Sequence, residues 1–114
     1  MTRAARLDDT FAALADPTRR AVVALLRDEP RRASDVADAL SMSRPAMSRH
    51  LRVLRKAGLV EEEALDDDAR VRIYRLRRKP FSELRTWLDE VESFWADQLD
   101  AFKAHAEARA RRRS

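Results

Sequence analysis

The chain has 114 residues, about the length of one domain, and 39% of them are charged. It contains no cysteine, which excludes disulfides, thiolate metal sites and cysteine catalysis. The net charge of +4 suits a polyanionic partner. Because we find neither a long apolar run nor a signal peptide, we expect a cytoplasmic protein without a membrane segment.

The positive charge is concentrated in the first half of the chain. Residues 1–60 carry 12 basic and 7 acidic side chains, whereas residues 61–114 carry 12 and 13. Residues 41–60 hold four arginines and one lysine with no acid. A single-sign stretch within one helix indicates a polyanion-binding surface better than the charge of the whole chain does.

Two helices are predicted before residue 30. Leu7, Phe11 and Leu14 recur at i, i+4 and i+7, which is typical of a short amphipathic helix. Asp16 and Pro17 follow it. Because an aspartate caps free N–H groups and proline fits the first helical position, they predict the start of a second helix.

A third and a fourth short helix are predicted next, joined by a tight turn at residues 41–43. Ser34 is the expected cap of the third helix, and Ser43 is the expected cap of the fourth. Gly58, the only glycine, stands where a left-handed residue would end the fourth helix.

A hairpin and a long helix complete the predicted order. Residues 59–65 and 70–76 read as two strands around an acidic turn at 66–69. After Pro80, apolar residues keep helical spacing through Phe102. We therefore predict a mainly α protein with a small β-hairpin, a winged helix-turn-helix of about five helices and a two-stranded wing. Residues 1–106 would form one domain, and residues 107–114 a basic, disordered tail.

The fourth helix has the composition of a DNA-reading helix. With its apolar residues turned inward, the opposite face carries an exposed polar stripe. Arginine offers a bidentate donor pair to guanine, and serine serves several bases. The alternative is an ordinary solvated basic face, and the position after a capped turn and before a hairpin favours DNA. The stripe consists of Arg44, Pro45, Ser48, Arg49 and Arg52.

Three segments resemble the signatures of ArsR-type winged-helix repressors. They are residues 11–20 (FAALADPTRR), residues 48–60 (SRHLRVLRKAGLV) and residues 70–76, the second wing strand. The last helix, with its Trp-Leu and Phe-Trp pairs, resembles a metal-independent branch of that family. The resemblance implies a homodimeric, sequence-specific repressor of a palindromic double-stranded DNA operator.

The resemblance also implies which residues touch DNA. Base contacts carry over to Arg44, Pro45, Ser48 and Arg49, and the wing arginines become phosphate candidates. Ala69 stands where the family usually has glycine, and the aspartates at 66–68 should keep the wing tip away from phosphate. The full candidate set is Ser34, Ser43, Arg44, Pro45, Ser48, Arg49, Arg52, Arg70 and Arg72.

In the family, the first and last helices build the dimer. The aromatic stripe of the last helix could instead line a small-molecule pocket, so an unidentified effector stays open. The expected dimer interface consists of Leu7, Phe11, Leu14, Leu84, Leu88, Val91, Trp95, Leu99 and Phe102.

Other functions fit the sequence less well. Family metal sensors use cysteines on the third helix or His/Asp sets on the last, but Asp97, Asp100 and His105 make a poor zinc set. We therefore expect no metal and no cofactor. With no phosphate-binding glycine loop and no nucleophile–base pair, we expect no enzyme. The alternative is a winged-helix protein–protein interaction module that lacks specific DNA binding.

Overall fold

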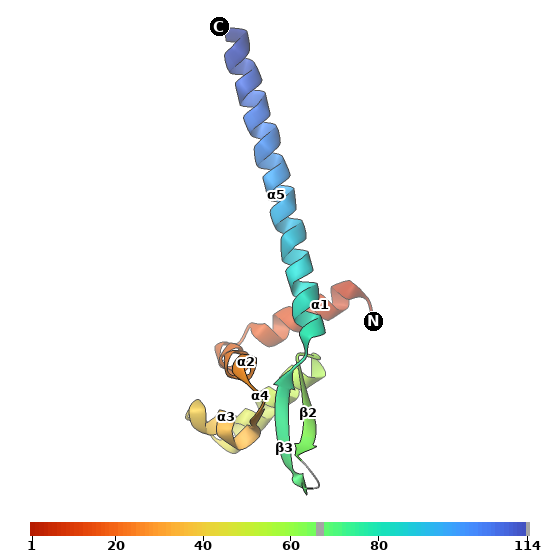
Figure 1. Cartoon of the computed structure of the whole chain (residues 1–114), viewed down its shortest axis with the longest axis vertical. Coiled ribbons are helices and arrows are strands. Elements are labelled where there is room, and N and C mark those ends of the chain that lie inside the picture. Colours follow the sequence, from red (N-terminus) through yellow and green to blue (C-terminus); the bar gives the residue numbers. More distant parts are fainter. Residues whose placement is uncertain (66–67, 114) are drawn as a thin grey trace. The chain divides into compact units, whose positions relative to one another are not determined.

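The computed structural model describes residues 1–65 and 68–113, and the side chains of all of these except 68 and 69. Five helices and three strands lie in these ranges. They form two compact groups of residues, 1–83 and 84–114. In chain order the elements are α1 (Arg3–Leu14), α2 (Pro17–Asp28), β1 (Arg31–Arg32), α3 (Ala33–Ala39), α4 (Arg44–Lys56), β2 (Val60–Leu65), β3 (Asp68–Leu76) and α5 (Arg78–Arg113) (Figure 1).

The predicted caps set the start of α2 and of α4. The Asp16 side chain accepts a hydrogen bond of 3.1 Å from the backbone N–H of Arg19. Ser43 Oγ accepts one of 3.3 Å from the backbone N–H of Ala46. In both helices a proline occupies the first turn, where its missing N–H costs no helical hydrogen bond. Both predicted helix starts are therefore confirmed.

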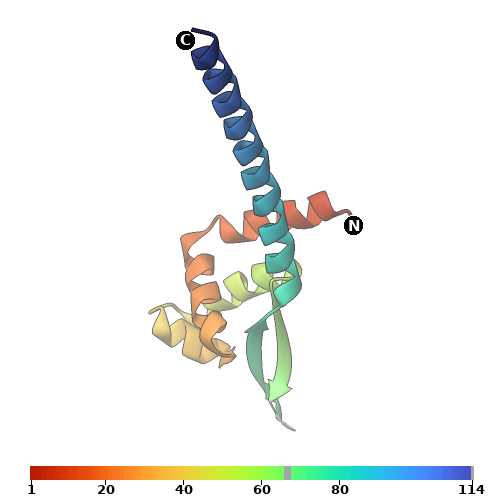
Figure 2. The same ribbon diagram turned by 45° about the horizontal axis from the view of Figure 1, so that its top comes forward.

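The wing is an antiparallel hairpin in which β2 and β3 lie side by side (Figures 1 and 2). Val60 pairs with Leu76 and Glu62 pairs with Tyr74. The predicted turn at 66–69 is corrected in part, because β3 already includes residues 68 and 69. Residues 66 and 67 lie outside the described part of the chain. The winged helix-turn-helix fold is confirmed.

A third strand, β1, was not predicted. Arg31 and Arg32 pair with Tyr74 and Ile73, so β3 lies between β1 and β2. This strand also corrects the start of α3. The cap position is Arg32, whose side chain makes no capping hydrogen bond, and Ser34 lies inside the first turn of the helix.

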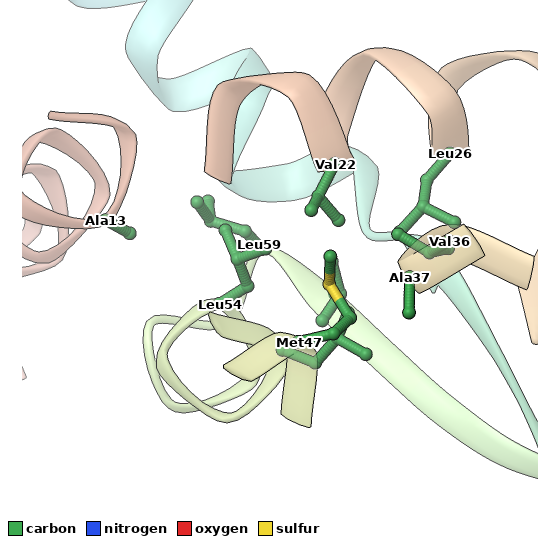
Figure 3. Close-up of a cluster of buried hydrophobic side chains, with 10 residues drawn as sticks. Ala13, Val22, Leu26, Val36, Ala37, Met47, Leu54 and Leu59 are labelled. Carbon is green, nitrogen blue, oxygen red and sulfur yellow. The ribbon is translucent and has the colours of Figure 1, made fainter. Parts of the chain in front are cut away.

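The core lies between α2, α3, α4 and the base of the hairpin. Met47 and Leu54, on the inner face of α4, are 1% and 0% exposed. Figure 3 shows these side chains together with those from the neighbouring elements. The buried cluster consists of Ala13, Val22, Leu26, Val36, Ala37, Met47, Leu51, Leu54, Leu59 and Val60. This packing fixes which face of α4 remains available to a partner.

The last helix differs from the prediction at both ends. It begins at Arg78, two residues before Pro80, because proline is tolerated in a first turn. It continues to Arg113, so residues 107–113 are helical, where a disordered tail was expected. Ser114 lies outside the described residues.

Gly58→Ala should lower the free energy of unfolding by about 1 kcal/mol. Gly58 has φ +79°, a left-handed conformation that alanine adopts only at a cost. The added Cβ would lie 3.4 Å from Arg77 Nη1, the end of a flexible side chain, so the penalty comes from the backbone. Urea unfolding at a fixed chain concentration measures it. Gly58→Asn, which tolerates this conformation better, is the control, and an alanine variant as stable as the wild type would contradict the prediction.

Candidate nucleic-acid interface

The predicted DNA-reading residues of α4 lie on its solvent face. Because Met47, Leu51 and Leu54 turn into the core, the side chains on the opposite side of the helix turn outward. The exposed ones on the helix are Arg44, Pro45, Ser48, Arg49 and Arg52, and the N-cap residue Ser43 is exposed as well. The structure therefore places these candidates on one helix and leaves them accessible.

The arginines of α4 fall into two electrostatic groups. Arg55 forms an ion pair with Glu62 of β2, so its charge is already compensated. Within the described ranges, no ion pair engages Arg44, Arg49 or Arg52. The acid-free stretch of sequence therefore contains one arginine whose charge is compensated in the fold and three whose charges are not. These three all lie in the first two and a half turns of α4.

A surface hollow of about 370 Å³ lies where α3, α4, β1 and β3 meet. It gathers five of the predicted residues from three separate segments, together with Arg32. Four arginines and no acid line it, so its potential favours a phosphate. The lining residues are Arg32, Ala33, Ser34, Arg44, Ser48, Arg70, Val71, Arg72 and Tyr74.

Sequence reasoning missed Arg32. Its exposed side chain enters the hollow because β1 pairs with β3. The sequence does not indicate this strand, since two residues are too few to show a periodicity. Pro45, Arg49 and Arg52 lie outside the hollow on the open face of α4. Ser34 lines the hollow but is half-buried.

A chain of hydrogen bonds connects the wing to α4. Glu62 of β2 pairs with Arg55 of α4 through one oxygen and accepts a 2.8 Å hydrogen bond from Tyr74 Oη of β3 through the other. Burial, reinforced by the Glu62 carboxylate, raises the pKa of Tyr74 above its usual value. The shift is in the direction that keeps the proton on the hydroxyl, which donates it to Glu62.

His50 lies half-buried beside Arg19 rather than in the exposed stripe. Arg19 Nη1 lies 3.4 Å from His50 Nδ1, and Arg19 Nε donates a 2.7 Å hydrogen bond to the carbonyl of Ala13. The backbone hydrogen bond from Arg19 lowers the pKa of Asp16 in the same cluster. These contacts favour a packing role for His50 that joins α1, α2 and α4.

The predicted dimer residues of α1 differ in how much surface they offer. Leu7 is only 7% exposed in the single chain, so it is largely covered already. Leu14 packs against the core. Phe11 keeps 41% of its surface exposed. Of the three, Phe11 therefore offers most of the apolar surface that a second copy could cover, and their place in a dimer interface stays a prediction.

On α5, large apolar side chains are exposed between residues 88 and 102. Phe94 and Trp95 pack edge to face with ring centroids 6.2 Å apart. A soluble chain rarely leaves so many large apolar residues uncovered in succession. The exposed fractions are 46% for Leu88, 36% for Val91, 59% for Phe94, 61% for Trp95, 65% for Leu99 and 72% for Phe102. Leu84 is half-buried.

The described residues hold neither a metal-binding cluster nor a membrane-spanning helix. They contain no group of three or more His, Asp or Glu side chains close enough to hold a metal ion. Within residues 1–65 and 68–113, every helix is too short or too polar to span a lipid bilayer.

The chain is similar to known transcription regulators. A helix-turn-helix domain family matches residues 14–63, which include the whole of α2 through α4. The HTH-type transcriptional regulator Rv2034 of Mycobacterium tuberculosis is 39% identical over 95 residues, covering 83% of each chain. The transcriptional repressor SdpR of Bacillus subtilis is 34% identical over 56 residues, covering 49% of this chain and 62% of its own.

Solved structures agree with these relatives. An ArsR-like transcriptional regulator from Rhodococcus sp. RHA1 superimposes with a TM-score of 0.78 at 32% identity, over 95% of this chain and 98% of the other. The ArsR family transcriptional regulator RHA00566 gives a TM-score of 0.72, also at 32% identity, over 80% and 97%. The similarity thus extends beyond the helix-turn-helix to most of the chain.

Proposed function

The chain belongs to the ArsR family of helix-turn-helix transcription regulators, and on that premise we propose that it is a homodimeric repressor that binds an inverted-repeat operator. It is a DNA-binding regulator, like its relatives. In the proposed arrangement, α4 enters the major groove and the hollow beside it receives the DNA backbone. No metal takes part in the proposed function.

One observation carries the proposal: among the described residues no acid compensates Arg44, Arg49 or Arg52 of α4, and the adjoining hollow adds three more arginines from β1 and β3. A duplex presents one negative charge per about 1.7 Å of its axis, so these side chains are favoured at its surface. Arg44 and Arg49 are assigned to base edges. Arg52, Arg70 and Arg72 are assigned to phosphates, because they flank the reading face.

The dimer follows from geometry as well as from the exposed stripe of α5. An inverted repeat needs two reading helices about 34 Å apart, and one chain supplies one such helix. A second copy that covers the apolar residues of α5 would also remove six large exposed apolar side chains from water.

Arg72→Ala should weaken binding to all duplexes by a similar factor and reduce the slope of log K against log salt by about one unit. Arg72 is exposed and lines the hollow, so its loss removes a phosphate contact without changing base readout. Fluorescence anisotropy with operator and scrambled duplexes at several salt concentrations measures both quantities.

Arg85→Ala is the matched control, because Arg85 lies on α5 and faces Asp89 at 3.9 Å. It should leave the salt slope unchanged. An unchanged slope for Arg72→Ala would remove the wing from the interface. Weak binding that does not distinguish the operator from the scrambled duplex, and that is unchanged when the α4 arginines are removed, would favour the protein–protein interaction module instead.

A further inference from the structure

A second surface hollow lies on residues 14–81 and is separate from the arginine-lined one. Its volume is about 850 Å³, within the range of small-molecule sites in proteins. It is formed by α2, the end of β3, the first turn of α5 and Leu14 of α1. The lining residues are Leu14, Arg20, Val23, Ala24, Leu26, Arg27, Asp28, Glu29, Pro30, Arg75, Leu76, Arg77, Arg78 and Phe81.

The floor of this hollow is apolar. Leu14, Val23, Leu76 and Phe81 are partly buried and pack against the core with their inner sides. Their outer sides line the hollow, so a ligand with a hydrocarbon or aromatic body would cover apolar surface there. Because the core supports these side chains from below, the floor is built before any ligand arrives.

The wall of the hollow is strongly basic. Five of its lining residues are arginines and two are acids. Both acids already face arginines: Asp28 lies 3.6 Å from Arg27, and Glu29 lies 3.8 Å from Arg31. In the described part of the chain, Arg77 and Arg78 take part in no ion pair. The charge therefore favours an anion.

Arg75 supplies a second indication of an anionic partner. It forms an ion pair with Glu63 through Nη2, but its Nε–H is buried without a hydrogen-bond partner among the described residues. A buried guanidinium N–H without an acceptor is costly, and native structures rarely retain one. If the guanidinium rotates slightly, a carboxylate bound in the hollow would accept a hydrogen bond from this Nε–H.

We propose that this hollow is a binding site for a small amphipathic carboxylate, whose apolar body lies on the Leu14–Val23–Phe81 floor and whose head meets Arg75. Charge alone would equally suit inorganic phosphate, and apolar surface alone would suit a neutral hydrocarbon. The combination of floor and arginine wall selects a ligand that carries both parts.

Isothermal titration calorimetry of the full chain without DNA tests the proposal independently of operator binding. The probes are decanoate, below its micellar concentration, and 2-naphthoate, which differ in body shape but share the carboxylate. The controls are decan-1-ol, which has the apolar body without the carboxylate, and inorganic phosphate, which has the negative charge without the apolar body. We expect saturable binding of at least one carboxylate, with one molecule per chain. Each control compound should bind at least about tenfold more weakly.

Variants locate the site. Arg75→Gln should weaken carboxylate binding at least about tenfold, and Arg75→Lys should restore part of it. Because Arg75 also pairs with Glu63, Ala24→Glu is a second probe at an exposed helical position that lines the hollow. It should repel the carboxylate by a similar factor, while Ala24→Gln should bind as the wild type does. Arg109→Gln, outside the hollow, controls for net charge.

Circular dichroism establishes that each variant is folded before its affinity is compared. Three results would overturn the proposal: no saturable binding of either carboxylate, binding of decan-1-ol or phosphate as tight as that of the carboxylates, or unchanged affinity in both Arg75→Gln and Ala24→Glu.

Discussion

Leu99→Asp should convert the protein from a dimer into a monomer and weaken binding to a two-half-site operator at least about a hundredfold. Leu99 is 65% exposed in the single chain, so aspartate there leaves the folded chain intact. In the proposed dimer the same carboxylate would be buried without a partner, which costs several kcal/mol. Sedimentation velocity measures the association state, and anisotropy with one-site and two-site duplexes measures the loss of joint binding.

Ser93→Asp is the matched control, because it places the same charge on the face of α5 opposite the apolar stripe, at another exposed position. It should remain dimeric, and Leu99→Met should as well. If Leu99→Asp sediments as the wild type does, α5 is not the dimer interface. If it is monomeric but keeps full affinity for the two-site duplex, the two reading helices do not act together.

Replacing both Arg44 and Arg49 by alanine should reduce operator affinity by about 2–6 kcal/mol while changing binding to scrambled DNA much less. A bidentate arginine–guanine contact contributes about 1–3 kcal/mol of base discrimination, and the two side chains lie on different turns. Both are exposed and outside the core, so folding should be unaffected. Each single variant should relax the preference at its own base pair.

Lys56→Ala is the control for this pair, because it removes a positive charge from the last turn of the same helix. It should act on operator and scrambled duplexes alike. An equal loss on every duplex for Arg49→Ala would make Arg49 a phosphate contact and contradict its assignment to a base.

Much of the helical framework could be predicted from the sequence, since its signals are local. Asp16 and Ser43 each cap a helix through a backbone N–H three residues away, and both lie before a proline. Gly58 ends α4 in the left-handed conformation expected of it. Such signals need only a few neighbouring residues, so the exposed face of α4 followed correctly from its buried one.

The missed features depend on partners that are distant in the sequence. Arg32 enters the arginine-lined hollow through the pairing of β1 with β3, whose partner residue, Ile73, is 41 positions along the chain. The same strand displaces the N-cap of α3 from the predicted Ser34 to Arg32. Likewise, the sequence shows Arg55 in an acid-free stretch, although the fold pairs it with Glu62.

The apolar stripe of α1 is another feature whose partner could not be predicted from the local sequence. Leu7, Phe11 and Leu14 share one helical stripe, and periodicity cannot tell a stripe covered by the chain's own core from one covered by a second copy. In the structure Leu7 is buried and Leu14 packs on the core, so Phe11 carries most of the remaining apolar surface of the three.

Selection of bound duplexes from a random-sequence pool by the full chain, followed by sequencing, tests the central claim most directly. A homodimer that reads DNA with α4 should enrich an inverted repeat whose half-sites are centred about 10 base pairs apart. The Arg44→Ala and Arg49→Ala variants should each lose the preference at one symmetry-related pair of positions. Enrichment of a single unrepeated site, or of no sequence at all, would contradict the claim.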